Sequence, residues 1–158
     1  MLPIADRMGL EDNAAMTTPP SPDHRSTVLG MYSAFGRGDI ASVLAAIADE
    51  PDWGLDPDAP VVVAVPWLAR VSTKHEVGSG YFAAVAADLE WHGLEPLAVG
   101  QDGDHVVATL RASFTVRATG KSVDALETHF FTFAPDGRVA RYRPIIDTAA
   151  FIDAFTAP

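Results

Sequence analysis

The chain of 158 residues has the length of one ordinary domain, and its 48% hydrophobic and 20% charged residues are typical of globular proteins. A formal net charge of −10 argues against a protein that binds nucleic acid through its phosphates or that adheres to anionic lipid. The sequence has no cysteine, which excludes disulfides, a thiol nucleophile and cysteine-bound metals, and we expect a cytoplasmic protein.

The beginning of the chain reads as a mobile leader rather than as part of a fold. Residues 1–22 are polar, end in the run TTPPSP and lack the apolar core of a secretory signal; Met16 offers an alternative start. The most apolar stretch, residues 59–69, is short for a membrane span and is interrupted by Pro66. We therefore expect one domain over residues 23–158 and no membrane partner.

Two short helices open the predicted domain. Ser-Pro at residues 21–22 is typical of a helix start, apolar residues follow at helical spacing, and Gly-Arg-Gly at 36–38 ends this helix. Asp39 then caps a second helix, whose apolar stripe reaches Ile47 and which Pro51 ends. The pattern predicts an αα-hairpin.

A third helix follows an irregular, proline-marked stretch that contains the valine run 61–65. Thr73 and Glu76 have the spacing of a capping box, which predicts a helix from there to Leu89. Because two glycines come next, a start at Ser79 is the alternative.

The last third of the chain has the composition of strands. Residues 94–99, 105–119, 122–133 and 138–147 are rich in β-branched and aromatic residues, and Asp-Gly at 136–137 predicts a hairpin between the last two. A short helix over 148–155 closes the sequence. Helices followed by antiparallel strands indicate an α+β protein.

This order, together with three segments, resembles the nuclear transport factor 2-like superfamily and its SnoaL-like and ketosteroid-isomerase-like members. The segments are YSAFGRGDIASVLAAIADEPDW (32–53), GSGYFAAV (78–85) and HFFTFAPDGRVARYRPIID (129–147), and the resemblance covers residues 24–155. It implies a cystatin-like cone, in which an αα-hairpin and a further helix pack on a strongly curved, mixed but mainly antiparallel sheet. It also implies a homodimer formed through the outer face of that sheet.

The resemblance implies a deep apolar cavity, which suits a small lipophilic ligand. A carboxyl group buried there has a raised pKa and can act as an acid or base near neutral pH. The implied activity is that of a cofactor-independent isomerase, cyclase, dehydratase or hydrolase acting on a lipophilic carbonyl or cyclic compound. The triad of the isomerase does not carry over, since its positions fall on Met31, Leu55 and Thr128. The alternative function is a non-catalytic ligand-binding or dimerisation module.

His129 and Asp147 are the candidate catalytic residues. His129 opens the strand HFFTF, where it is either an acid or base for a ligand or a histidine satisfied by structural partners. Asp147 ends the last strand, where it is either an acid or base or the N-cap of the closing helix. The remaining histidines lack the spacing of metal ligands, so we expect no metal and no cofactor.

Which side chains share the cavity depends on the register of the last hairpin. A two-residue loop pairs residue 129 with residue 144 and places His129 and Tyr142 on one face. Arg143 and Asp147 then lie on the opposite face, whereas a one-residue bulge would bring both to the side of His129. Arg143 is accordingly either a clamp for a ligand oxygen or part of an ion-paired outer face. The candidate ligand-binding residues are Tyr32, Trp53, Phe82, Thr128, Tyr142 and Arg143.

Overall fold

The computed structural model describes residues 20–157, so most of the predicted leader lies outside the described residues. The predicted αα-hairpin is confirmed by α2 (His24–Gly36) and α3 (Ile40–Ala45). Asp23, rather than Ser21, caps α2, because its carboxylate accepts a hydrogen bond from the backbone N–H of Ser26.

A strand follows α3 where the sequence predicted more helix. The prediction of a helix up to Pro51 was wrong: Ile47–Trp53 forms β1, which pairs in parallel with β5 (Val139–Ile145). Trp53 lies opposite Tyr142 in this pairing. Because β1 is at the edge of the sheet and its register shifts before Asp52, the missing N–H of Pro51 is tolerated.

The middle of the chain is more helical than predicted. The stretch expected to be irregular forms the short helices α4 (Pro60–Ala64) and η1 (Pro66–Leu68). Thr73 and Glu76 make both hydrogen bonds of a capping box, so the third helix begins at Lys74, the earlier of the two predicted starts.

The third helix is interrupted by a wider, π-helical turn. Its successive parts are α5 (Lys74–Glu76), η2 (Val77–Phe82) and α6 (Ala83–Asp88). A Cβ atom at Gly78 would come within 2.9 Å of Leu44 Cδ1, so the glycine allows η2 to pack closely on α3. Such π-turns occur frequently at functional sites.

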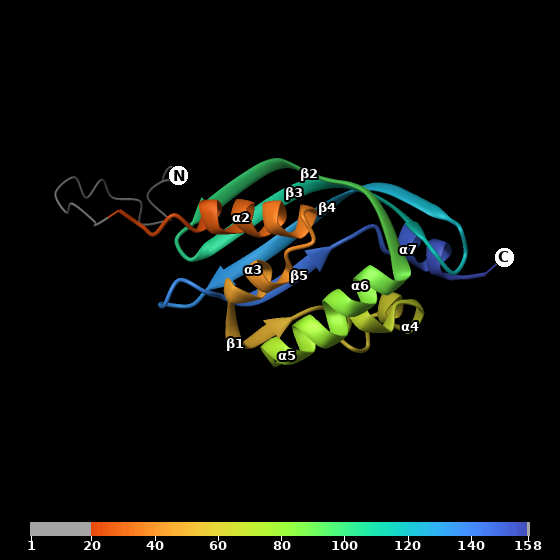
Figure 1. The fold of residues 1–158 in the computed structure, drawn as a ribbon, viewed down its shortest axis with the longest axis horizontal. Coiled ribbons are helices and arrows are strands. Elements are labelled where there is room, and N and C mark those ends of the chain that lie inside the picture. Colours follow the sequence, from red (N-terminus) through yellow and green to blue (C-terminus); the bar gives the residue numbers. More distant parts are fainter. Residues whose placement is uncertain (1–19, 158) are drawn as a thin grey trace, which may run out of the picture.

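Five strands form one curved sheet in the order β1-β5-β4-β3-β2 (Figure 1). The long strands β2 (Leu89–Asp102), β3 (His105–Val116) and β4 (Ser122–Phe133) are antiparallel, and β2 starts at Leu89 rather than at residue 94. Helix α7 (Thr148–Phe155) closes the fold over the predicted residues. The predicted mixed, mainly antiparallel α+β architecture is confirmed.

The hairpin between β4 and β5 decides which residues face the core. Ala134 N donates to Arg138 O, so the loop has three residues, and an irregularity around Ala140 then restores the alignment. His129 consequently lies opposite Pro144, and Phe131 lies opposite Tyr142. This is the register that the two-residue loop predicts, with His129 and Tyr142 on the same face.

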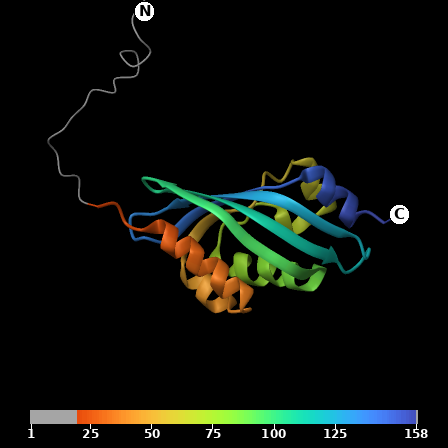
Figure 2. The same cartoon turned by 90° about the horizontal axis from the view of Figure 1, so that it is seen from above.

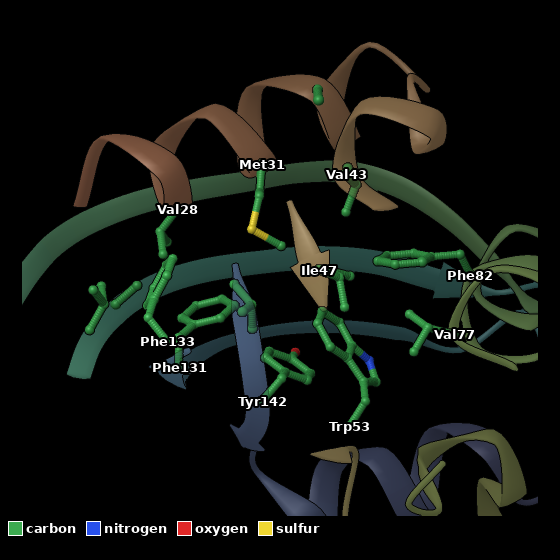
Figure 3. Packing of buried hydrophobic residues seen from close by; sticks show 14 residues of the cluster. Val28, Met31, Val43, Ile47, Trp53, Val77, Phe82, Phe131, Phe133 and Tyr142 are labelled. Atoms are coloured by element: carbon green, nitrogen blue, oxygen red, sulfur yellow. The ribbon is translucent and has the colours of Figure 1, made fainter. Parts of the chain in front are cut away.

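One face of the sheet carries the core. Figure 2 shows α2, α3 and the α5–α6 helix along one side of the curved strands, and Figure 3 shows side chains from α2 meeting those of the strands between these layers. The largest groups there are buried, among them Met31, Trp53, Phe131 and Tyr142. Within residues 20–157, no helix combines the length and the hydropathy that crossing a bilayer requires.

Candidate functional site

A cavity of about 80 Å³ lies between the sheet and the helices. A water needs roughly 10–15 Å³, so this volume holds several waters or a compact ligand of about one ring. Half of the residues that line the cavity are aromatic. Of the described residues in its wall, Glu127 is the one acid and His129 the one histidine, and none is a lysine or arginine.

Strand β4 supplies both of these ionisable groups. Alternate side chains of β4 are buried from Val123 to Phe133, except at Ala125, which is partly buried. Glu127 and His129 are two residues apart and therefore point to the same, cavity-facing side. They are only 6% and 7% exposed, so a carboxyl group and an imidazole are held away from bulk water.

A continuous series of hydrogen bonds joins these side chains to Tyr32 of α2. Glu127 Oε2 lies 3.2 Å from His129 Nε2, and His129 Nδ1 lies 2.9 Å from the Tyr32 hydroxyl oxygen. An ionised carboxylate accepts only, so His129 donates from Nε2. In the neutral imidazole Nδ1 is then the acceptor for the Tyr32 O–H.

The tyrosines of the cavity stay protonated. Burial, and secondarily the charge of Glu127, raises the pKa of Tyr32 far above its ordinary value. Burial also raises the pKa of Tyr142, with a smaller contribution from neighbouring Tyr81. Their hydroxyl groups are therefore hydrogen-bond donors, and none of them ionises by itself near neutral pH.

One oxygen of the buried carboxylate has no partner. Glu127 Oε1 is buried and makes no hydrogen bond to the described residues, although Oε2 is bonded to His129. Leaving a buried charged acceptor unsatisfied costs roughly 1–3 kcal/mol or more. Such an oxygen is a ready acceptor for a group that a ligand brings into the cavity.

Three of the predicted ligand-binding residues form the aromatic wall beside this series. The rings of Trp53 and Tyr142 are stacked with centroids 4.1 Å apart, and the ring of Tyr142 lies edge-on to His129 at 5.2 Å. Phe82, from the π-helical turn, packs against Trp53 at 5.9 Å. These three residues and Tyr32 line the cavity.

Three other predicted site residues lie elsewhere. Thr128 and Arg143 are on the outer face of the sheet, since they alternate with His129 and Tyr142, and Asp147 is exposed. Asp147 Oδ1 accepts a hydrogen bond from Ala150 N, so Asp147 is the N-cap of α7. This is the structural one of the two roles that the sequence allowed. None of the three lines the cavity, so the structure does not bring Asp147 to His129.

Arg143 instead belongs to a cluster around Asp52 of β1. It bonds the Asp52 carboxylate and the Asp52 backbone oxygen, and Arg141 and Arg70 approach the same carboxylate at 3.2 and 3.4 Å. Burial opposes ionisation of Asp52, but the hydrogen bond and charge of Arg143 outweigh it, so its pKa lies below the ordinary value. This cluster ties β1 to β5 behind the stacked Trp53 and Tyr142.

The sequence analysis missed Glu127. The signal was present, because in a strand a carboxylate two residues before a histidine shares its face. Among residues 20–157, no three His, Asp or Glu side chains come together as a group that could hold a metal ion.

The fold and the cavity define a nuclear transport factor 2-like protein with a buried carboxyl–imidazole pair. The chain belongs to the SnoaL-like domain family, whose model matches residues 28–142. No curated protein matches the chain at a significant level.

Solved structures show the same architecture. A nuclear transport factor 2-like protein of unknown function from Burkholderia pseudomallei is 25% identical, with a TM-score of 0.75 over 85% of this chain and 98% of its own. TerC, co-crystallised with polyporic acid, is 21% identical, with a TM-score of 0.72 over 84% and 97% of the two chains. A candidate polyketide cyclase from Pseudomonas putida is 15% identical, with a TM-score of 0.67 over 83% and 96%. The likeness to TerC and to the candidate cyclase, which are both less than 25% identical, shows that the fold is shared.

Proposed function

We propose that the protein is a cofactor-independent enzyme that moves a proton within a small lipophilic carbonyl or cyclic compound. The observation that supports this proposal is the series Glu127–His129–Tyr32 in the wall of an otherwise apolar cavity. A carboxylate that orients an imidazole, which in turn accepts from a hydroxyl, is the general arrangement that activates a hydroxyl oxygen.

The proton moves through Tyr32 and His129 together. Because its pKa is raised, Tyr32 does not release its proton alone, and it takes a proton from the substrate only while passing its own to His129 Nδ1. The imidazolium that results lies against Glu127, which stabilises it. The reverse transfer returns a proton to another atom of the substrate, so an isomerisation needs no further reactant.

Tyr142 supplies the second half of the chemistry. Removal of a proton beside a carbonyl group places negative charge on the carbonyl oxygen, and a protonated, buried hydroxyl can donate to that oxygen. Tyr142 is 4% exposed, and its ring packs against both His129 and Trp53. Among apolar side chains, such a donor acts more strongly than it does in water.

Deuterium exchange tests the proposed proton transfer without knowledge of the natural substrate. Cyclohexanone in D2O, followed by NMR, exchanges the protons beside its carbonyl group, and we expect the protein to accelerate this exchange above the buffer rate. His129→Gln and Tyr32→Phe should lower the acceleration about 10²–10⁴-fold. Asp147→Asn, which keeps an N-cap outside the cavity, is the matched control and should retain the full rate.

Two results would contradict the catalytic proposal. One is an exchange rate equal to that of buffer although cyclohexanone binds, which would favour the non-catalytic ligand-binding module. The other is an equal loss of rate in Asp147→Asn and His129→Gln, since a helix cap outside the cavity has no part in proton transfer.

We also propose that two copies associate through the outer face of the sheet, as the family resemblance implies. Leu126 and Ile145 are 60% and 61% exposed on this face, which also carries the less exposed Val107. Sedimentation velocity should give a dimer, and Leu126→Glu should shift it to a monomer. A cytoplasmic location stays a prediction from the acidic, cysteine-free sequence.

A further inference from the structure

Among the described residues, the cavity wall contains one acidic side chain and no lysine or arginine. Glu127 carries the one negative charge among the described residues that line the cavity, and no lysine or arginine lines it to compensate. His129 compensates Glu127 only when it is protonated. When His129 is neutral and its Nδ1 accepts from the Tyr32 hydroxyl, an ionised Glu127 gives the cavity a net charge of −1.

The two oxygens of the Glu127 carboxylate have different surroundings. Oε2 holds His129 Nε2 at 3.2 Å, whereas Oε1 is buried and unpartnered. A buried carboxylate oxygen of this kind is stabilised by a donor, and most strongly by a charged donor. No side chain described in the structure supplies that donor, so it comes from water or from a ligand in the cavity, and a charged ligand group is the stronger of the two.

The rest of the wall offers aromatic faces to a cation, and the buried, unpartnered Nε1–H groups of Trp53 and Trp91 to an acceptor on the same ligand. The rings of Tyr32, Trp53, Tyr81 and Tyr142 line the cavity, and the faces of such rings attract a cation within about 6 Å. The formal charge of −10 on the whole chain also raises the local concentration of cations and lowers that of anions.

We infer that the ligand of this cavity is a lipophilic ring compound with a protonated amine, which donates to Glu127 Oε1 and lies against the aromatic wall. The inference rests on the proposed function and names the substrate class for the same site. The ring fills the apolar volume, and the ammonium group neutralises the unpaired charge.

Charge neutrality is then kept throughout the proton transfer. Before transfer, the ammonium group of the ligand balances Glu127, while His129 and Tyr32 are neutral. After transfer, imidazolium and ammonium balance Glu127 and the negative oxygen of the substrate. A neutral substrate would leave a net charge of −1 in the cavity at every step, which a low-dielectric site disfavours.

Four cyclohexane derivatives that differ only in their head group test the inference. They are cyclohexylammonium, cyclohexanol, cyclohexanone and cyclohexanecarboxylate, measured by isothermal titration calorimetry at one pH and ionic strength. We expect cyclohexylammonium to bind about tenfold or more tightly than cyclohexanol, which is about 1.4 kcal/mol, and the carboxylate to bind least.

Two variants separate a local pairing from a general effect of charge. Glu127→Gln should remove the preference, so that cyclohexylammonium and cyclohexanol bind equally. Asp124→Asn removes one negative charge from the same strand, but from an exposed side chain paired with Arg111, and it should keep the preference. An equal loss of preference in both variants would overturn the inference.

The wild-type series distinguishes this inference from the proposed function. If cyclohexanone and cyclohexanol bind as tightly as cyclohexylammonium, the ligand class is wrong and the proton-transfer proposal stands. If none of the four compounds binds, the cavity does not accept a small ring and both proposals fall.

Discussion

Two carboxylates on opposite faces of the same sheet have opposite surroundings. Asp52, on the outer side, is about one third exposed and is surrounded by three guanidinium groups. Glu127, on the cavity side, is 6% exposed, has one imidazole as its partner and leaves one oxygen unsatisfied. Asp52 Oδ1 also makes no hydrogen bond to the described residues, but Arg70 Nε lies 3.4 Å from it, so the better-solvated carboxylate has three cations beside it and the buried one has a single imidazole.

This difference indicates that the contacts of Asp52 stabilise the fold, whereas the buried carboxylate of Glu127 serves the site. The cluster of Asp52 joins β1 to β5 and holds its carboxylate ionised. A buried charge without full compensation lowers stability and is retained where a ligand or a reaction uses it. Substitutions at the two carboxylates should therefore change stability in opposite directions.

The largest expected effect follows from removing the one partner of Glu127. His129→Ala should lower the free energy of unfolding by about 3–5 kcal/mol, because it leaves a buried carboxylate without compensation. The measurement is urea denaturation. The double variant His129→Ala/Glu127→Gln should recover a substantial part of the loss, since the unpaired charge is then gone; equal losses in both variants would show that packing alone is responsible.

Asp52→Asn should have the next largest effect. Loss of the charged hydrogen bond to Arg143 should lower the free energy of unfolding by about 1.5–3 kcal/mol near neutral pH. Since the folded pKa of Asp52 is depressed, its contribution is present above the unfolded value of about 3.9 and is lost as the pH falls through the folded pKa. The difference between the variant and the wild type should therefore shrink in acid.

A matched control is available for this prediction. Asp49 also pairs with two cations, Lys74 and Arg138, but its side chain is 74% exposed. Asp49→Asn should change stability less than Asp52→Asn does. A larger loss at Asp49 would mean that the outer cluster is not what ties β1 to the sheet.

The smallest effect distinguishes the two possible roles of Asp147. Asp147→Ala should lower the free energy of unfolding by about 1 kcal/mol, whereas Asp147→Asn should stay near the wild type because asparagine is an equally good N-cap. Neither variant should change deuterium exchange of cyclohexanone. A slower exchange with unchanged stability would restore Asp147 as a catalytic candidate.

Much of the fold could be predicted because the signals are local. The limits of β4 and α7 follow from alternation and from the Asp147 cap within the segments themselves. β1 could not be found in this way: its sequence, IADEPDW, is acidic and contains a proline, and it becomes a strand through parallel pairing with β5, far along the chain.

The site was predictable in part for the same reason. Tyr32, His129 and Tyr142 were candidates from their residue types and positions, but whether His129 and Tyr142 face the cavity depended on the register of β4 and β5. That register is set by a three-residue loop and an irregularity at Ala140 that offset each other, which no local pattern reveals. Glu127 was not predicted because a glutamate in a strand is ordinarily exposed, and its burial beside His129 depends on tertiary packing.

The most direct test of whether Glu127 serves the site rather than the fold is the free energy of unfolding of Glu127→Gln. It is measured by urea denaturation alongside that of Asp52→Asn. The amide preserves the shape of the side chain and removes the uncompensated charge. We predict a free energy of unfolding about 1 kcal/mol or more above the wild type, together with loss of the accelerated exchange. A variant less stable than the wild type, with exchange unchanged, would contradict this account of the cavity.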